Sequence, residues 1–166
     1  EASEFDSLTP SELVIALAIL KAHTVKELAP ADSLIIGCDS TFEFEGKSLG
    51  KPGSKENAIA RCKQLSGKSG YLHTGHCVID LKNGIELSER STSKVQFAQM
   101  TDAEINDYVD SGEPLNVAGG FTLDGLSAPF ITNIEGDPSG IIGLSLPLLR
   151  KMVISLGYSW PDLKNK

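Results

Sequence analysis

The chain has 166 residues, of which 40% are hydrophobic and 22% are charged, and its formal net charge is −7. That size and balance are typical of a soluble globular protein, with one domain around a real core or with two small lobes. The acidic balance argues against a protein that binds nucleic-acid polymers, which would need a basic surface to neutralise phosphates, but a single nucleotide needs only a few local cations. The three cysteines match no zinc spacing, so we expect reduced, mostly buried thiols in a cytosolic protein. No apolar run is long enough to span a bilayer.

The first clear signal along the chain is the start of a helix. Glu1 to Leu8 is short and acidic, and Thr9-Pro10-Ser11-Glu12 then forms a capping box with proline in the first turn. The residues that we expect to face the core are Leu13, Leu17, Leu20 and Thr24. Lys21 falls at the edge of that apolar face, where its side chain either extends into solvent or points its ammonium into a site beneath the helix.

A buried strand follows Pro30 and delivers Asp39 to what we predict is its carboxyl end, the edge where open α/β sheets bind ligands. The segment from Thr41 to Leu49 alternates phenylalanine and glutamate and turns at Gly46, which predicts a small hairpin that returns Lys51 towards Asp39. A carboxylate beside a lysine suits metal-assisted chemistry on a phosphate, with Asp39 holding a metal or orienting water. The alternative is an ordinary strand-end aspartate and a solvated turn lysine.

The middle of the chain predicts a helix and a β-hairpin. Ser54 is placed to cap a helix whose inward residues are Ala58, Ile59, Cys62 and Leu65. Strands over 71–80 and 85–97 are joined at Asn83-Gly84, a type I′ turn signal. The first of these strands contains His73, His76 and Cys77, but residues three apart on a strand face opposite sides, so we interpret them as structural rather than as metal ligands.

The last third of the chain is rich in glycine. Thr101 to Glu104 is a second capping box that opens a short helix ending near Gly112. The glycine clusters over 112–126 let the backbone approach a ligand or turn tightly, but they form neither a GxGxxG fingerprint nor a P-loop. We then expect a strand over 129–135, a loop over 136–140 and a final helix from near Ser145 to Gly157. The residues of that helix that we expect to be buried are Leu148, Leu149, Met152 and Leu156.

Seven short motifs stand in an order that resembles the Maf family over almost the whole chain. They are Lys21-Ala22, Asp39-Ser40, Gly50-Lys51-Pro52, Leu65-Ser66-Gly67, Thr74-Gly75, Gly112-Glu113-Pro114 and Ala118-Gly119. Maf proteins are nucleoside triphosphate pyrophosphatases that are also linked to septum formation and cell-division arrest. The resemblance implies a single α/β domain over 1–166, of the inosine-triphosphate-pyrophosphatase type, with a mixed central sheet flanked by helices, usually as a homodimer. It also implies cleavage of a nucleoside triphosphate to monophosphate and pyrophosphate with a divalent cation, Mg²⁺ or Mn²⁺.

The resemblance also implies roles for individual residues. Asp39 matches the family's general base and a metal ligand, and Lys21 and Lys51 match lysines that contact phosphates. Glu1 is the match for an acidic residue that assists at the metal. The positions that select the substrate fall on Ser40, which replaces a usual threonine, and on Asp124, and Glu113 of the Gly-Glu-Pro motif is a further substrate-binding candidate.

Two departures from the family pattern shape the expectations. Family members open with a strand and a Ser-x-Ser-Pro-Arg-Arg-like turn that serves the triphosphate, and we expect this segment to be missing from the sequence, which begins after it. A nucleotide-binding regulator of cell division without useful catalysis is therefore the alternative function. Asp124 stands where pyrimidine-preferring members carry glutamine, and an ionised aspartate only accepts hydrogen bonds. Asp124 should then prefer a base that presents N–H donors, such as guanine or a modified purine.

Overall fold

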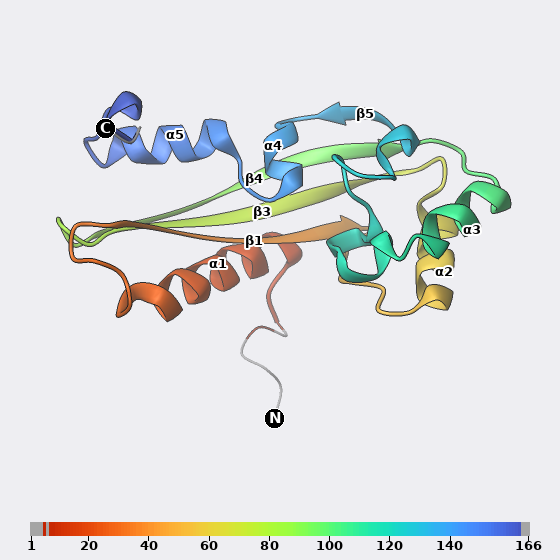
Figure 1. Cartoon of the computed structure of the whole chain (residues 1–166), viewed down its shortest axis with the longest axis horizontal. Helices are drawn as coiled ribbons and strands as arrows, with labels where there is room; N and C mark the ends of the chain where they lie inside the picture. Colours follow the sequence, from red (N-terminus) through yellow and green to blue (C-terminus); the bar gives the residue numbers. More distant parts are fainter. Residues whose placement is uncertain (1–4, 6, 164–166) are drawn as a thin grey trace.

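The computed structural model describes residue 5 and residues 7–163, and these are built around one five-stranded sheet in the order β2-β1-β3-β4-β5 (Figure 1). The strands are β1 (Leu34–Phe44), β2 (Lys47–Leu49), β3 (Ser69–Asp80), β4 (Ile85–Phe97) and β5 (Ile131–Glu135). The expected α/β architecture, with helices flanking a central sheet, is confirmed. The expected mixture of strand directions is not found among the described strands, which all pair antiparallel, and tight hairpins join β1 to β2 and β3 to β4.

Most of the helices lie at the two ends of this sheet. They are α1 (Pro10–Lys26), α2 (Lys55–Leu65), α3 (Asp102–Asp110), α4 (Pro138–Ile142) and α5 (Leu146–Ser155). Figure 1 shows α1 and α5 on opposite faces at one end, and α2 beside α3 at the other end. Short 3₁₀ turns η1 (Glu113–Asn116), η2 (Ala118–Gly120), η3 (Ala128–Phe130) and η4 (Trp160–Leu163) complete the described chain. No helix in this part of the chain is long and apolar enough to cross a membrane.

The ends of the elements follow the capping and turn signals closely. Thr9 and Thr101 each close a capping box, at α1 and α3, and Ser54 caps α2. Asn83 and Gly84 lie in the turn that joins β3 to β4, as predicted, but the predicted type I′ geometry is wrong. The turn spans the four residues 81–84, and Asn83 does not have the positive φ that a type I′ turn requires. The segment 136–140 was predicted as a loop, and this prediction is wrong, because the Asp137 carboxylate accepts two backbone N–H groups and starts the short helix α4.

The face of α1 that packs on the sheet differs from the predicted leucine stripe. The fully buried residues of α1 are Val14, Ala18 and Ala22, whereas Leu20 is 51% exposed. The reason lies beneath the helix, where β1 contributes Gly37 and β3 contributes Gly75. A Cβ atom on either glycine would fall within 3.0 Å of the α1 backbone, so the helix lies too close to the sheet for leucine side chains to fit between them.

Strand β1 also runs further than predicted. It continues to Phe44, so Asp39 lies in the middle of the strand, opposite Gly75 of β3, and not at a carboxyl end. The extension follows from Phe42 and Phe44, which are buried in a cluster with Phe97 and the loop residue Phe121. The predicted hairpin after β1 is confirmed, with Phe42 opposite Leu49.

The three cysteines are free thiols, as expected, with Cys62 and Cys77 buried and Cys38 half-buried. Burial raises the pKa of Cys38 to about 11, so its thiol stays protonated near neutral pH.

The buried imidazole of His76 connects β3 to the start of α5. Its Nδ1 donates to the carbonyl oxygen of Thr74 at 3.0 Å, and its Nε2 accepts from the backbone N–H of Ser145 at 2.9 Å. Both partners fix the same neutral tautomer, because a carbonyl only accepts and an amide N–H only donates. Protonation of Nε2 would set two donors against each other, so the fold requires a neutral His76.

Acidification is therefore expected to destabilise the protein through His76. Burial lowers the pKa of His76 below its ordinary value of 6.5, although the hydrogen bond to Thr74 opposes the shift. The unfolded chain then binds a proton that the folded chain does not, so the stabilisation is complete above about pH 6.5 and is lost as the pH falls below it. We expect the free energy of unfolding in urea to fall by up to about 1.4 kcal/mol per pH unit in that range.

The matched variants are His76→Gln, which should remove this pH dependence, and His23→Gln at an exposed position of α1, which should keep it. An unchanged loss of stability between pH 6.5 and 5 in His76→Gln would show that another group is responsible.

Candidate functional site

The ammonium of Lys21 points at Asp39. Its Nζ lies 2.5 Å from Asp39 Oδ1 and donates to the carbonyl oxygen of Cys38 at 3.2 Å. The side chain of Asp39 is only 19% exposed, whereas that of Lys21 is 57% exposed. Of the two orientations considered for Lys21, the structure has the one directed into a site. The close approach of α1 to Gly37 and Gly75 brings this lysine within reach of β1.

A pocket of about 200 Å³ opens on the other side of β1. Ser40 and Asp124 both line it, together with apolar side chains from β3, the glycine-rich segment and α4. Its volume is below the roughly 300–1,000 Å³ typical of pockets for drug-sized ligands, so it would enclose part of a ligand. The structure thus brings together the two positions predicted to select the substrate. Asp124 is exposed and has no hydrogen-bond or ion-pair partner among the described residues.

The two halves of the site lie on opposite faces of one strand. Asp39 and Ser40 are neighbours on β1, and successive side chains of a strand point to opposite faces. Within the described residues, β2 pairs with β1 only from Phe42 onwards, so the edge of β1 beside Asp39 and Ser40 carries no neighbouring strand on that side. Among the described strands, the two halves of the site thus meet at an edge of β1 that pairs on one side only.

Lys51 lies on a backbone segment that is held by hydrogen bonds at the residues before and after it. The guanidinium of Arg61 donates to the carbonyl oxygen of Gly50 at 3.1 Å, Asn57 donates to that of Pro52 at 3.1 Å, and the N–H of Gly53 donates to the Leu115 carbonyl. The Lys51 ammonium has no hydrogen-bond or ion-pair partner among the described residues, and no interaction in that part of the chain joins it to Asp39. The pairing of β1 with β2 ends at Phe42 and Leu49, two residues before Lys51.

Glu113 holds the loop that carries Asp124. Its Oε1 accepts from the hydroxyl of Thr122 at 2.5 Å, and both carboxylate oxygens accept from the backbone N–H of Leu126, at 2.9 and 3.1 Å. Burial raises the pKa of Glu113, but these hydrogen bonds outweigh it, and the pKa lies below its ordinary value. The carboxylate is thus charged and occupied by the loop. Direct contact of Glu113 with a substrate stays a prediction.

Among the described residues, a metal ion would have few protein ligands and would be held largely by the phosphates of a bound substrate. These residues contain no group of three His, Cys, Asp or Glu placed to hold a metal ion. Mg²⁺ in phosphate-handling sites is commonly bound by one or two carboxylates together with substrate phosphates. Asp39 can serve as one such carboxylate, since Lys21 occupies only its Oδ1. Glu1, the second predicted ligand, lies outside the described residues.

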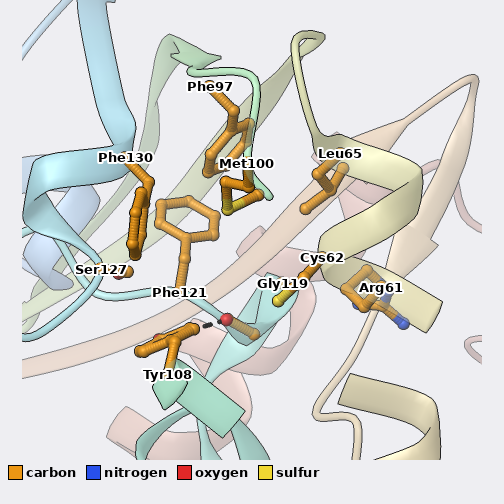
Figure 2. A pocket seen from close by; sticks show the side chains of 11 residues that line it. Arg61, Cys62, Leu65, Phe97, Met100, Tyr108, Gly119, Phe121, Ser127 and Phe130 are labelled. Atoms are coloured by element: carbon orange, nitrogen blue, oxygen red, sulfur yellow. Dashed lines mark hydrogen bonds between the residues drawn. The ribbon is translucent and has the colours of Figure 1, made fainter. Parts of the chain in front are cut away.

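A second, much smaller cavity shares Phe121 with the pocket. Figure 2 shows its lining by α2, α3 and the loop residues Phe121 and Phe130, with the Tyr108 hydroxyl donating to the Gly120 carbonyl at 3.3 Å. Its volume of about 10 Å³ is close to that of a single water probe. Phe121 also lines the larger pocket and packs edge-on against Phe42 and Phe97. Phe121 thus separates the small cavity from the larger pocket and belongs to the lining of both.

Sequence reasoning missed part of the pocket wall. Ile141 and Ile142 line the pocket from the end of α4, a helix that was not predicted. Thr74 was noted only as part of a motif, yet its hydroxyl contacts that of Ser40 at 2.7 Å. The alternating pattern of β3 could have placed Thr74 on the same face as the buried His76, but no local signal indicates its partner on β1.

The chain is similar in sequence to known proteins over most of its length. The family model described as Maf-like protein matches residues 1–156. The chain is 50% identical over 164 residues to a nucleoside triphosphate pyrophosphatase of Thermosynechococcus vestitus, covering 99% of this chain and 83% of the relative. It is 51% identical to one of Streptomyces coelicolor, covering 93% and 76%, and 44% identical to one of Leifsonia xyli subsp. xyli, covering 99% and 79%.

Proposed function

The chain belongs to the Maf family, and from that premise we propose that it hydrolyses nucleoside triphosphates to the monophosphate and pyrophosphate. One observation carries the proposal. Adjacent residues of β1 set a carboxylate–lysine pair on one face and a pocket on the other, beside an edge that pairs with no described strand. This arrangement suits a ligand with an aromatic ring at one end and phosphates at the other.

In the proposed reaction the base occupies the pocket of Ser40 and Asp124, and the triphosphate passes over the edge of β1. A water molecule attacks the α-phosphorus, its proton passes to the carboxylate of Asp39, and the bond from that phosphorus to the bridging oxygen breaks. Lys21 and Lys51 neutralise the charge that develops on the leaving pyrophosphate. The ion pair with Lys21 also holds Asp39 in place.

A divalent cation, Mg²⁺ or Mn²⁺, is part of the proposal. Asp39 would hold it, with Glu1 as the further ligand that the family resemblance implies. When bound, the cation would neutralise triphosphate charge and polarise the phosphoryl group.

The test is release of pyrophosphate from a panel of canonical and modified nucleoside triphosphates, with each cation. It is run on this chain and on one to which a Ser-x-Ser-Pro-Arg-Arg-like segment of the family has been added at the N-terminus. We expect one pyrophosphate for each monophosphate formed. Binding of nucleotides without release of pyrophosphate from either chain would overturn the proposal in favour of a regulator.

Replacing Asp124 with glutamine is expected to change the base preference. An ionised aspartate only accepts hydrogen bonds, whereas glutamine both donates and accepts. We expect the wild type to favour guanosine triphosphate, and Asp124→Gln to move the ratio of kcat/KM towards uridine triphosphate by about tenfold, as one rearranged polar contact can do.

The control is Asp32→Asn, an exposed aspartate between α1 and β1, which should leave the ratio unchanged. A wild type that prefers uridine or thymidine triphosphate would refute the assigned role of Asp124.

Oligomeric state and location are part of the same proposal. The family resemblance supports a homodimer, and α1 exposes apolar side chains, with Leu20 at 51% and Val25 at 44%, that a second copy could cover. The free thiols support a reducing, cytoplasmic setting.

A further inference from the structure

The polar side chains that line the pocket are Ser40, Thr122 and Asp124. Two of them are hydroxyls, and each could in principle donate or accept a hydrogen bond. Whether these hydroxyls donate or accept towards the pocket decides which base the pocket can hold. The surrounding contacts determine where the hydroxyl protons lie.

Thr74 determines the direction of the Ser40 hydroxyl. Thr74 is fully buried and lies opposite Ser40 in the pairing of β1 with β3. Its Oγ1 donates to the carbonyl oxygen of Gly140 in α4 at 2.7 Å, which uses its only proton. The 2.7 Å contact between the two hydroxyls is therefore a hydrogen bond donated by Ser40. Ser40 is left with lone pairs to present to the pocket.

Glu113 determines the direction of the Thr122 hydroxyl. The Thr122 hydroxyl donates to Oε1 of the Glu113 carboxylate at 2.5 Å, so its proton also points away from the pocket. Asp124, when ionised, has no proton to donate. All three polar side chains of the pocket thus present acceptors.

We propose that Thr74 and Glu113 set the hydrogen-bonding polarity of the pocket, and so select bases that present N–H donors, by taking up the protons of Ser40 and Thr122. The proposal rests on the proposed function, in which this pocket holds the base. Thr74 and Glu113 are positioning residues here, since each acts through a hydroxyl and not on the substrate itself. Guanine, with adjacent N–H donors at positions 1 and 2, fits such a pocket better than adenine, which presents an acceptor at position 1.

The test compares guanosine and adenosine triphosphates in wild type, Thr74→Val and Thr74→Ser. Without the Thr74 hydroxyl, Ser40 can turn its proton to the pocket, so Thr74→Val should lower the guanosine-to-adenosine ratio of kcat/KM by about threefold to tenfold, the usual size of one hydrogen bond. Thr74→Ser keeps the hydroxyl and should keep the ratio. Glu113→Gln, whose amide can donate to Thr122, should lower the ratio independently if Thr74→Val does not fold.

Two controls separate polarity from packing. Ser93 also ties the sheet to the start of α4, accepting from the N–H of Asp137 at 3.0 Å and donating to its carbonyl at 3.1 Å, but it does not contact Ser40. Ser93→Ala should therefore leave the ratio unchanged. In a Ser40→Ala background, Thr74→Val should change the ratio no further, because the hydroxyl through which it acts is gone.

The proposal is overturned if Thr74→Val and Glu113→Gln change kcat/KM for both nucleotides by the same factor, as a purely structural role would do. Dissociation constants for the two nucleotides are measured in parallel. Absence of pyrophosphate release would overturn the proposed function alone, while the ratio of dissociation constants would still decide the polarity of the pocket.

Discussion

Replacing Asp39 with asparagine is expected to lower kcat for pyrophosphate release by about 10²–10⁴-fold, the usual contribution of a general base. Asparagine keeps the shape of the side chain and an oxygen that can accept from Lys21, but it cannot take the proton of the attacking water. Stability should change little, because the ion pair at 2.5 Å involves a lysine that is 57% exposed, and exposed pairs contribute only about 0–1 kcal/mol. Steady-state rates and urea unfolding of the same preparations measure both effects.

The matched control is Asp110→Asn, which removes an ion pair with Lys55 of similar length, 2.9 Å, at the far end of the sheet. It should leave kcat unchanged. If Asp39→Asn retains most of the activity, Asp39 is not the base, and the role of its pair with Lys21 reduces to positioning.

Replacing Gly75 with alanine is expected to destabilise the protein by about 3 kcal/mol or more, at the upper end of the range for overpacked sites. In an open strand this change would normally be favourable, since glycine is the poorer strand former. Here the new Cβ would meet the Val14 carbonyl and the Ile15 nitrogen, all within 3.0 Å, and helix backbone cannot turn aside as a flexible side chain can. The helix must move away, which should also carry Lys21 from Asp39 and lower kcat.

Urea unfolding measures the loss of stability, with Gly50→Ala as the control because a Cβ there has nothing within 4 Å. We expect Gly50→Ala to lie within about 1 kcal/mol of wild type or slightly above it. A Gly75→Ala protein as stable as Gly50→Ala would show that α1 can lift from the sheet without cost.

The sequence allowed the ends of most elements to be predicted, because those ends depend on local chemistry. The hydroxyls of Thr9 and Thr101 cap helices through contacts within four residues, and Gly84 supplies the positive φ of the turn between β3 and β4. The inward face of α1 could not be predicted in this way. Its leucines favour a face other than the one buried, and the close approach of α1 to Gly37 and Gly75 reverses this preference.

The same distinction applies to the candidate site. The family resemblance predicted Lys21, Asp39, Ser40 and Asp124 as site residues. The structure places them in two pairs: Lys21 bonds Asp39, and Ser40 lines the same pocket as Asp124. That the pairs lie on opposite faces depends on Asp39 being inside β1 and not at its end. This in turn depends on Phe42 and Phe44 meeting a buried cluster formed much later in the chain. No local pattern contains that information.

The glycine at position 37 has a consequence for how the chain is aligned as it folds. A slip of β1 by one residue would exchange Asp39 and Ser40 between the two faces, and with them the acid–base group and the selecting hydroxyl. Gly37 is the one residue of β1 without a Cβ, and α1 leaves space for nothing larger. A slipped strand would drive the side chain of Ile36 or Cys38 into the helix backbone. The misaligned arrangement is thus disfavoured by steric clash. The packing of α1 on Gly37 therefore fixes the alignment of β1, and with it the faces on which Asp39 and Ser40 lie.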